Sequence, residues 1–216
     1  MNGHYARPAG IVRGLHVITE APGVRGAMGH EEIVREALSG GARLVQFRDK
    51  SLPKDEFRNM AFRLRDITSG LAVFIVNDDL ETALDCEADG VHLGQDDMPL
   101  PMAREIAGDR LIIGISTHSL EEALAAQAGG ADYIGFGPIF NTATKDAGEA
   151  KGPGAIRHIR DKIKIPIVAI GGIKLENAAE VFDAGADAVA VISAISRAKD
   201  AAGAARRFVE LFNRRF

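Results

Sequence analysis

The sequence has no tryptophan and a single cysteine, Cys86, among its 216 residues. One cysteine excludes a disulfide within the chain, and scarcity of cysteine is typical of proteins from a reducing compartment. We therefore expect a cytoplasmic protein. Because Cys86 stands between Leu84 and Ala88 in a stretch with helical spacing, we interpret it as a small buried residue and not as a nucleophile.

Long apolar stretches and an excess of positive charge are also missing. No run of about 18 apolar residues occurs, so no segment is predicted to cross a membrane. The first ten residues hold no apolar signal core, so we expect no secretory leader. The formal net charge is −4, which gives no overall basic field to attract nucleic acid or anionic lipid. Any anion site therefore has to be local.

What the sequence does contain is typical of a globular α/β protein. Hydrophobic residues make up 46% and charged residues 26%, and the 24 glycines suit many tight turns. No low-complexity stretch or linker divides the chain, so we predict one domain over residues 1–216. The sequence leaves open whether the protein forms a homo-oligomer.

A short pattern built around alanine, and usually aspartate, recurs four times and opens a predicted strand each time. Its copies are at 41–46, 87–92, 130–135 and 185–190, and further apolar strands are predicted at 15–18, 73–76, 111–115 and 167–170. Between strands, residues 31–39, 80–86, 120–128 and 177–184 place apolar side chains at helical spacing. Eight strands alternating with helices predict a (β/α)8 TIM barrel, with a doubly wound open sheet as the alternative.

Polar residues and glycines follow the predicted strands at their carboxyl ends, where a barrel carries its active site. In chain order they are Gln46, Arg48 and Lys50; Asn77 and Asp78; Asp97; Ser116; Thr142, Thr144 and Lys145; Gly171 and Gly172; and Ile192 and Ser193. Because side chains alternate along a strand, the amide and two cations at 46, 48 and 50 share one face. Burying them unpaired is costly, so either nearby carboxylates or a phosphate-bearing ligand has to neutralise them.

Two aspartates, Asp78 and Asp97, are candidate ligands of Mg²⁺, which takes carboxylate oxygens, water and substrate phosphate. Each has a structural alternative as the cap of a following helix. For the neighbouring Asp79 the cap is the preferred interpretation. No set of Cys and His residues with the spacing of a zinc site is present.

Glycines 171 and 172, together with Ile192 and Ser193, are predicted to cradle a phosphate group, because the loops after strands seven and eight often do so in barrels. Simple turn glycines are the alternative. The polar loop 141–152 is predicted to be a lid, or else a plain solvated loop. His92 is interpreted as a satisfied core histidine, and His16 and His118 as structural or surface residues.

Taken in order, these segments resemble the thiamine-phosphate synthase, or thiamine-phosphate pyrophosphorylase, family from about Leu15 to Arg197. The matching segments are 46–50, 76–78, 90–97, 114–116, 135–140, 142–145, 169–172 and 191–195. The resemblance implies a (β/α)8 barrel and a transferase of thiamine biosynthesis. Such an enzyme joins a hydroxymethylpyrimidine diphosphate to a hydroxyethylthiazole phosphate, releases pyrophosphate and uses Mg²⁺.

The resemblance also implies roles for the matching residues. The pyrimidine diphosphate is held by Gln46, Arg48, Lys50, Asn77, Ser116 and Lys145, of which Arg48, Lys50, Ser116 and Lys145 form the catalytic set. The thiazole phosphate is held by Thr142, Thr144, Gly172, Ile192 and Ser193, and Mg²⁺ by Asp78 and Asp97. Phe47, Asp49 and Ala143 lie inside matched segments and are counted with the substrate-binding residues, although alternation turns Phe47 outward and Asp49 has no assigned role.

Two positions, Asn141 and Pro138, bear on how closely the chain follows the synthase family and on its alternative functions. Asn141 stands where the family usually has proline, which affects the stiffness of the loop and not its donors. Related thiazole phosphate tautomerases share the barrel but carry histidine where this chain has Pro138, so Pro138 favours the synthase. A tautomerase and a non-catalytic sensor of a phosphate ligand are the alternative functions, and the paired aspartates weigh against the sensor.

Overall fold

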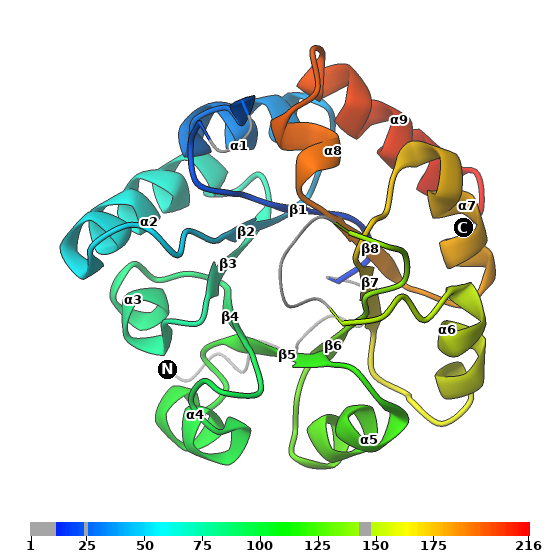
Figure 1. The fold of residues 1–216 in the computed structure, drawn as a ribbon. Helices are drawn as coiled ribbons and strands as arrows, with labels where there is room; N and C mark the ends of the chain where they lie inside the picture. Colours follow the sequence, from blue (N-terminus) through cyan, green and yellow to red (C-terminus); the bar gives the residue numbers. More distant parts are fainter. Residues whose placement is uncertain (1–11, 24–25, 143–147) are drawn as a thin grey trace.

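The computed structural model describes residues 12–23, 26–142 and 148–216. Within them, eight parallel strands close into a barrel in sequence order, and the helices surround it (Figure 1). The strands are β1 (Gly14–Ile18), β2 (Leu44–Phe47), β3 (Val73–Asn77), β4 (Gly90–Leu93), β5 (Ile112–Thr117), β6 (Tyr133–Phe136), β7 (Ile167–Ile170) and β8 (Ala188–Val191). The predicted barrel is confirmed, and the pairing of Leu15 in β1 with Val189 in β8 excludes the open sheet.

The helix boundaries follow the local signals of the sequence. The helices are α1 (His30–Ser39), α2 (Lys54–Thr68), α3 (Leu80–Asp85), α4 (Leu100–Ala107), α5 (Leu120–Ala128), α6 (Pro153–Arg160), α7 (Leu175–Asp183), α8 (Ser193–Ser196) and α9 (Ala201–Asn213). Helix α5 starts after Ser119, whose hydroxyl accepts the Glu122 amide. Helix α7 starts earlier than predicted, because the side chain of Asn177 accepts the Lys174 amide and caps the turn. None of the helices in the described ranges is both long and apolar enough to cross a membrane.

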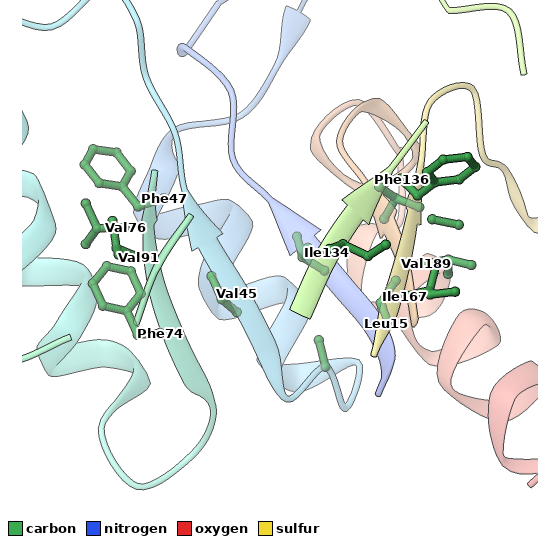
Figure 2. Close-up of a cluster of buried hydrophobic side chains, with 14 of the residues drawn as sticks. Leu15, Val45, Phe47, Phe74, Val76, Val91, Ile134, Phe136, Ile167 and Val189 are labelled. Carbon is green, nitrogen blue, oxygen red and sulfur yellow. The ribbon is translucent and has the colours of Figure 1, made fainter. Parts of the chain in front are cut away.

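Alternation along the strands divides their side chains between two apolar layers. On the outer surface, Val45 and Phe47 of β2 lie in the cluster between the barrel and its helices (Figure 2). On the inner surface, Leu44 of β2 and Ile75 of β3 lie in a second cluster inside the barrel. The same alternation turns Gln46 inward, where it is 2% exposed. The apolar pattern of β2 therefore decides which of its polar residues face the interior.

The recurring aspartates hold the amino ends of the strands together. Asp187 precedes β8 and accepts hydrogen bonds from the Ile167 amide at 2.8 Å and the Arg160 guanidinium at 2.7 Å. The equivalent pairs of the preceding units are Asp89 with Arg65 and Asp132 with Arg104. The sequence repeat is thus a structural clamp, placed at the end of the barrel opposite the carboxyl ends of the strands.

Two glycines make room for large polar side chains inside the barrel. A Cβ on Gly114 of β5 would lie 2.0 Å from the ring of Tyr133 on β6, which is fully buried. A Cβ on Gly135 of β6 would lie 3.1 Å from the ring of His92 on β4. The missing side chains on β5 and β6 therefore allow a tyrosine and a histidine to occupy the barrel interior.

Candidate active site

A cavity of about 460 Å³ lies at the carboxyl ends of the strands. It gathers predicted site residues that are far apart in the chain, namely Gln46, Arg48, Asn77, Ser116, Thr142, Gly172, Ile192 and Ser193. Ala143, Thr144 and Lys145 lie outside the described residues. The barrel therefore brings members of both predicted substrate-binding groups to one cavity.

Arg48 projects into the cavity from the end of β2, and its backbone is held by β1. The Arg48 amide donates to Thr19 Oγ1 at 3.0 Å, and the Thr19 hydroxyl donates to the Arg48 carbonyl at 3.2 Å. Among the described residues, no carboxylate lies within ion-pair distance of the Arg48 guanidinium. Of the two neutralisers that the sequence left open, a ligand anion therefore fits Arg48 better than a protein carboxylate.

Lys50 has a different environment, because its ammonium nitrogen lies 3.6 Å from Oδ2 of Asp78. Its side chain is largely exposed and it is not among the residues that line the cavity. The pair joins the end of β2 to the end of β3. Lys50 is therefore neutralised in part by the protein, and it is free to turn to a ligand at little cost because exposed ion pairs are weak.

Asp78 and Asp97 come together as a carboxyl pair beside this lysine. Burial raises the pKa of Asp78 to about 6, aided by the hydrogen bond with Asp97 and by its charge, while Lys50 and Arg48 oppose the rise. Asp78 has a φ of 66°, a conformation that aspartate adopts only at a cost, and its amide donates to the His92 carbonyl. Two ionised carboxylates this close repel each other, and a cation bound between them would offset that repulsion.

The capping alternative is excluded for both aspartates. The carboxylate that accepts an amide at the start of α3 belongs to Asp79, which bonds the Thr82 amide at 2.9 Å as expected for a cap. Helix α4 begins after Pro99 without a side-chain cap, and Asp97 instead accepts the Gly94 amide at 2.7 Å. No group of three or more His, Cys, Asp or Glu ligands occurs among the described residues, so a cation here needs water or substrate oxygens as further ligands.

A chain of buried polar side chains forms one wall of the cavity. His92 Nδ1 lies 2.9 Å from the Tyr133 hydroxyl, and His92 Nε2 lies 2.9 Å from Ser116 Oγ. His16 contacts Gln46 at 3.4 Å and leaves its own Nδ1 without a partner. Burial lowers the pKa of His16 to about 3 and that of His92 to about 4, so both rings are neutral near pH 7.

These buried groups were missed or undervalued from the sequence. His92 is the satisfied core histidine that the sequence predicted, yet it also lines the cavity, as do His16, His118 and Tyr133. The signal that could have found His16 and His92 is their inward register on β1 and β4. No sequence pattern predicts that His16 contacts Gln46 or that His92 contacts Tyr133 and Ser116.

The carboxyl ends of β7 and β8 carry the predicted phosphate cradle, whose residues line the same cavity. Gly172 has a φ of 62°, and a Cβ there would lie 2.5 Å from the Asn141 carbonyl, so the turn requires glycine. Ser193 is the first residue of α8. At the end of that helix, Arg197 Nε donates to Glu20 Oε1 at 3.0 Å, and both side chains line the cavity. Sequence reasoning did not select Glu20 or Arg197.

Two residues of the matched segments point away from the cavity. The ring of Phe47 is fully buried on the outer side of β2 and stacks on Phe57 with ring centroids 4.4 Å apart. Asp49 is 8% exposed and contacts His30 of α1. Both follow the alternation that turns Gln46 and Arg48 inward. Neither side chain lines the cavity, so neither is positioned to touch a ligand there.

The chain is similar to known proteins over most of its length. Residues 15–195 match the family described as thiamine monophosphate synthase. The chain is 51% identical over 203 residues to a thiamine-phosphate synthase of Methanospirillum hungatei, covering 92% of this chain and 97% of the relative. It is 48% identical to that of Chloroflexus aurantiacus, covering 89% of each chain.

Solved structures agree with the sequence matches. The thiamine phosphate pyrophosphorylase from Pyrococcus furiosus superposes with a TM-score of 0.85 at 44% identity, covering 93% of this chain and 96% of that one. A 3-hexulose-6-phosphate synthase superposes with a TM-score of 0.72 at 16% identity, which shows the shared barrel and nothing more.

Proposed function

The chain belongs to the thiamine monophosphate synthase family, and on that premise we propose that it joins hydroxymethylpyrimidine diphosphate to hydroxyethylthiazole phosphate. The products are thiamine phosphate and pyrophosphate. The observation that carries the proposal is the position of Arg48, a cavity-lining cation without a carboxylate partner among the described residues, in the same cavity as a glycine turn suited to a second phosphate.

In this reaction the bond between the pyrimidinylmethyl carbon and the diphosphate oxygen breaks, and its electron pair leaves with pyrophosphate. The lone pair of the thiazole nitrogen forms the new bond to that carbon. The electron-rich aminopyrimidine stabilises positive charge on the carbon, so ionisation can precede attack. The attacking nitrogen carries no proton, so the step needs no general base. Neutral His16 and His92 suit a wall that binds the ring without repelling that charge.

The departing diphosphate gains negative charge, and cations near it stabilise the transition state. Arg48 supplies one such charge from the cavity wall, and Lys50 supplies another by turning from Asp78. Ser116, held by His92, and Asn77 at the end of β3 offer neutral hydrogen bonds to the same substrate. Lys145, which lies outside the described residues, completes this set on the evidence of the family motif alone.

We propose Asp78 and Asp97 as the residues that hold Mg²⁺. Their contact, their partial burial and the raised pKa of Asp78 fit a hard divalent cation that takes its other ligands from water and the diphosphate. When bound, the cation neutralises charge on the leaving group. The protein's own contribution is to keep the two carboxylates together at the ends of β3 and β4.

The thiazole phosphate is proposed to bind at the other side of the cavity. Gly172 and the segment from Ile192 to Ser193 offer backbone amides, and Thr142 lines the same cavity. Thr144 belongs to this group by resemblance. Binding both substrates in one cavity holds the thiazole nitrogen near the reacting carbon, and such positioning supplies much of the acceleration in two-substrate reactions.

A coupled assay tests the proposal. The purified protein is mixed with both substrates and Mg²⁺, and thiamine phosphate is detected by chromatography after oxidation to a fluorescent thiochrome. Formation of thiamine phosphate together with equimolar pyrophosphate is expected. Absence of product at saturating substrate would overturn the proposal, and conversion between thiazole tautomers without coupling would assign the tautomerase instead.

Two broader expectations stay predictions. A cytoplasmic location follows only from the scarcity of cysteine, and fractionation of cells tests it. A homo-oligomer is left open by the sequence, and light scattering on the purified protein measures the molar mass in solution against the 23.0 kDa of one chain.

A further inference from the structure

We propose that Asp49 is a positioning residue, whose buried carboxylate ties the segment carrying Arg48 and Lys50 to the first residue of α1, His30. The inference rests on the proposed function, because it assigns the tie the task of holding the diphosphate-binding cations in place. Asp49 does not line the active-site cavity, so it acts through its neighbours and not on the substrate.

The contacts of Asp49 use both oxygens of its carboxylate. Oδ1 accepts hydrogen bonds from the Ser51 amide at 2.7 Å, the Ser51 hydroxyl at 2.6 Å and the Leu52 amide at 3.3 Å. Oδ2 lies 2.8 Å from His30 Nε2, and the two side chains are 0% and 1% exposed. One oxygen therefore shapes the turn after β2, and the other joins that turn to a neighbouring helix.

The backbone of the same segment is held from β1 as well. Thr19, which directly follows β1, exchanges two hydrogen bonds with the amide and carbonyl of Arg48. Thr19 and His30 both belong to the β1–α1 unit, and α1 lies outside the barrel next to β1 and β2 (Figure 1). The two cations thus sit on a short segment anchored at residue 48 by Thr19 and at residue 49 by His30.

Alternation explains why this arrangement serves the cavity. Arg48 faces inward and Asp49 faces the helices, so a tie at Asp49 fixes the backbone without occupying space near the ligand. A cation on a fixed backbone loses less conformational freedom on binding than one on a mobile loop, and the saved entropy appears as tighter binding. The Asp49 carboxylate is stabilised by its hydrogen bonds with Ser51, Leu52 and His30, and it does not pair with Arg48.

The electrostatics agree with this geometry. Burial acts to raise the pKa of Asp49, but the hydrogen bonds from Ser51 and the contact with His30 outweigh it and leave the pKa below its ordinary value. Because a carboxylate only accepts, the hydrogen of His30 lies on Nε2 and points at Asp49. The other ring nitrogen, Nδ1, is buried without a partner, so contacts with Asp49 and Phe47 orient this ring.

The test uses Asp49→Asn, which keeps an acceptor for the amides of Ser51 and Leu52 but turns an NH₂ group toward the His30 N–H. Calorimetry with inorganic pyrophosphate and Mg²⁺ is expected to show about tenfold weaker binding, which corresponds to about 1.4 kcal/mol. In turnover, the KM for the pyrimidine diphosphate rises while the KM for the thiazole phosphate stays unchanged. His30→Phe, which keeps a ring against Phe47 and removes the donor, has the same effect.

The matched control is Asp187→Asn, which weakens a partly buried aspartate clamp at the far end of the barrel. It lowers the thermal midpoint without changing pyrophosphate binding or either KM. Equal pyrophosphate affinity in Asp49→Asn and wild type would overturn the inference alone. Failure of the wild type to bind pyrophosphate would overturn it together with the proposed function. A parallel loss in Asp187→Asn would show a general effect of stability and would also overturn the inference.

Discussion

The ammonium nitrogen of Lys50 lies 3.6 Å from Oδ2 of Asp78. A residue predicted to bind the diphosphate therefore contacts a residue predicted to bind the metal ion. The sequence offered two ways to neutralise the cations that follow β2, by carboxylates or by a phosphate ligand. The structure distinguishes the two cations, because Lys50 lies beside the Asp78 carboxylate, whereas no carboxylate in the described ranges lies within ion-pair distance of Arg48. The two cations are therefore expected to respond differently to substitution.

Lys50→Met is expected to lower kcat/KM for the pyrimidine diphosphate by about a hundredfold, since one of the charges on the leaving group is lost. Affinity for Mg²⁺ alone stays the same or rises, because a cation next to Asp78 is removed. Steady-state kinetics and calorimetry with MgCl₂ measure the two effects. Lys54→Met is the control, since Lys54 pairs with the exposed Glu81 on the helices outside the barrel. Unchanged turnover in Lys50→Met would remove Lys50 from the site.

Arg48→Ala is expected to reduce turnover by about a hundredfold to a thousandfold with the fold intact, because its guanidinium lines the cavity and forms no ion pair with a carboxylate of the described residues. Circular dichroism checks the fold and the coupled assay measures the rate. Arg58→Ala removes a surface arginine paired with Asp85 and serves as the matched control. Near-normal activity of Arg48→Ala would contradict its place in the diphosphate site.

Substitution of the carboxyl pair tests the metal site separately. Asp78→Asn and Asp97→Asn are each expected to weaken Mg²⁺-dependent pyrophosphate binding at least about tenfold, since each removes a charged oxygen ligand. Asp79→Asn keeps the cap on the Thr82 amide and leaves binding unchanged. If Asp79→Asn has the larger effect, the assignment of ligands at the end of β3 is wrong.

Stability is expected to depend on pH through His16, whose pKa of about 3 lies far below its ordinary value of 6.5. The unfolded chain binds the proton more readily, so this contribution is fully present above about pH 6.5 and is lost as pH falls toward 3. As pH falls from 7.5 to 5.0, protonation of His16 in the unfolded chain is expected to lower the free energy of unfolding by about 2 kcal/mol.

Urea unfolding of the wild type and of His16→Gln at the two pH values measures the difference. The comparison between variants matters because Asp78, with its pKa raised to about 6, contributes with the opposite sign in the same range. His158→Gln replaces an exposed histidine on α6 and keeps the wild-type slope. Equal slopes for the wild type and His16→Gln would show that His16 does not become charged on unfolding.

Gly114→Ala is expected to destabilise the barrel by about 1–3 kcal/mol, because its Cβ would lie 2.0 Å from the ring of the fully buried Tyr133. Movement of Tyr133 also disturbs His92 and, through it, Ser116. Gly154→Ala on α6 meets no atom within 4 Å and raises stability slightly. Denaturant unfolding and the coupled assay together distinguish packing from catalysis, and a stable, fully active Gly114→Ala would contradict the packing argument.

Much of the barrel was predictable because its cause is local. Apolar runs of strand length, helical spacing between them and the four-fold repeat depend only on neighbouring residues, and they placed all eight strands. The inward row of Gln46 and Arg48 followed from alternation for the same reason. The motifs at the strand ends then identified the family over most of the chain.

Contacts between distant residues had no such local signal. The sequence favoured a cap for Asp79 but left Asp78 and Asp97 open between metal ligand and cap, and only the positions of the Thr82 and Gly94 amides decide between these roles. The sequence left Asp49 without a role, since its partner His30 lies 19 residues earlier on another element.

The sequence alone determined the fold, the family and the face on which polar residues gather, because periodicity and motif are properties of the chain itself. Only the tertiary structure decided which cation meets Asp78, that His16 and His92 are buried neutral rings, and that Asp49 joins two elements. Each of these depends on burial and on distances across the closed barrel, which arise only when β8 pairs with β1.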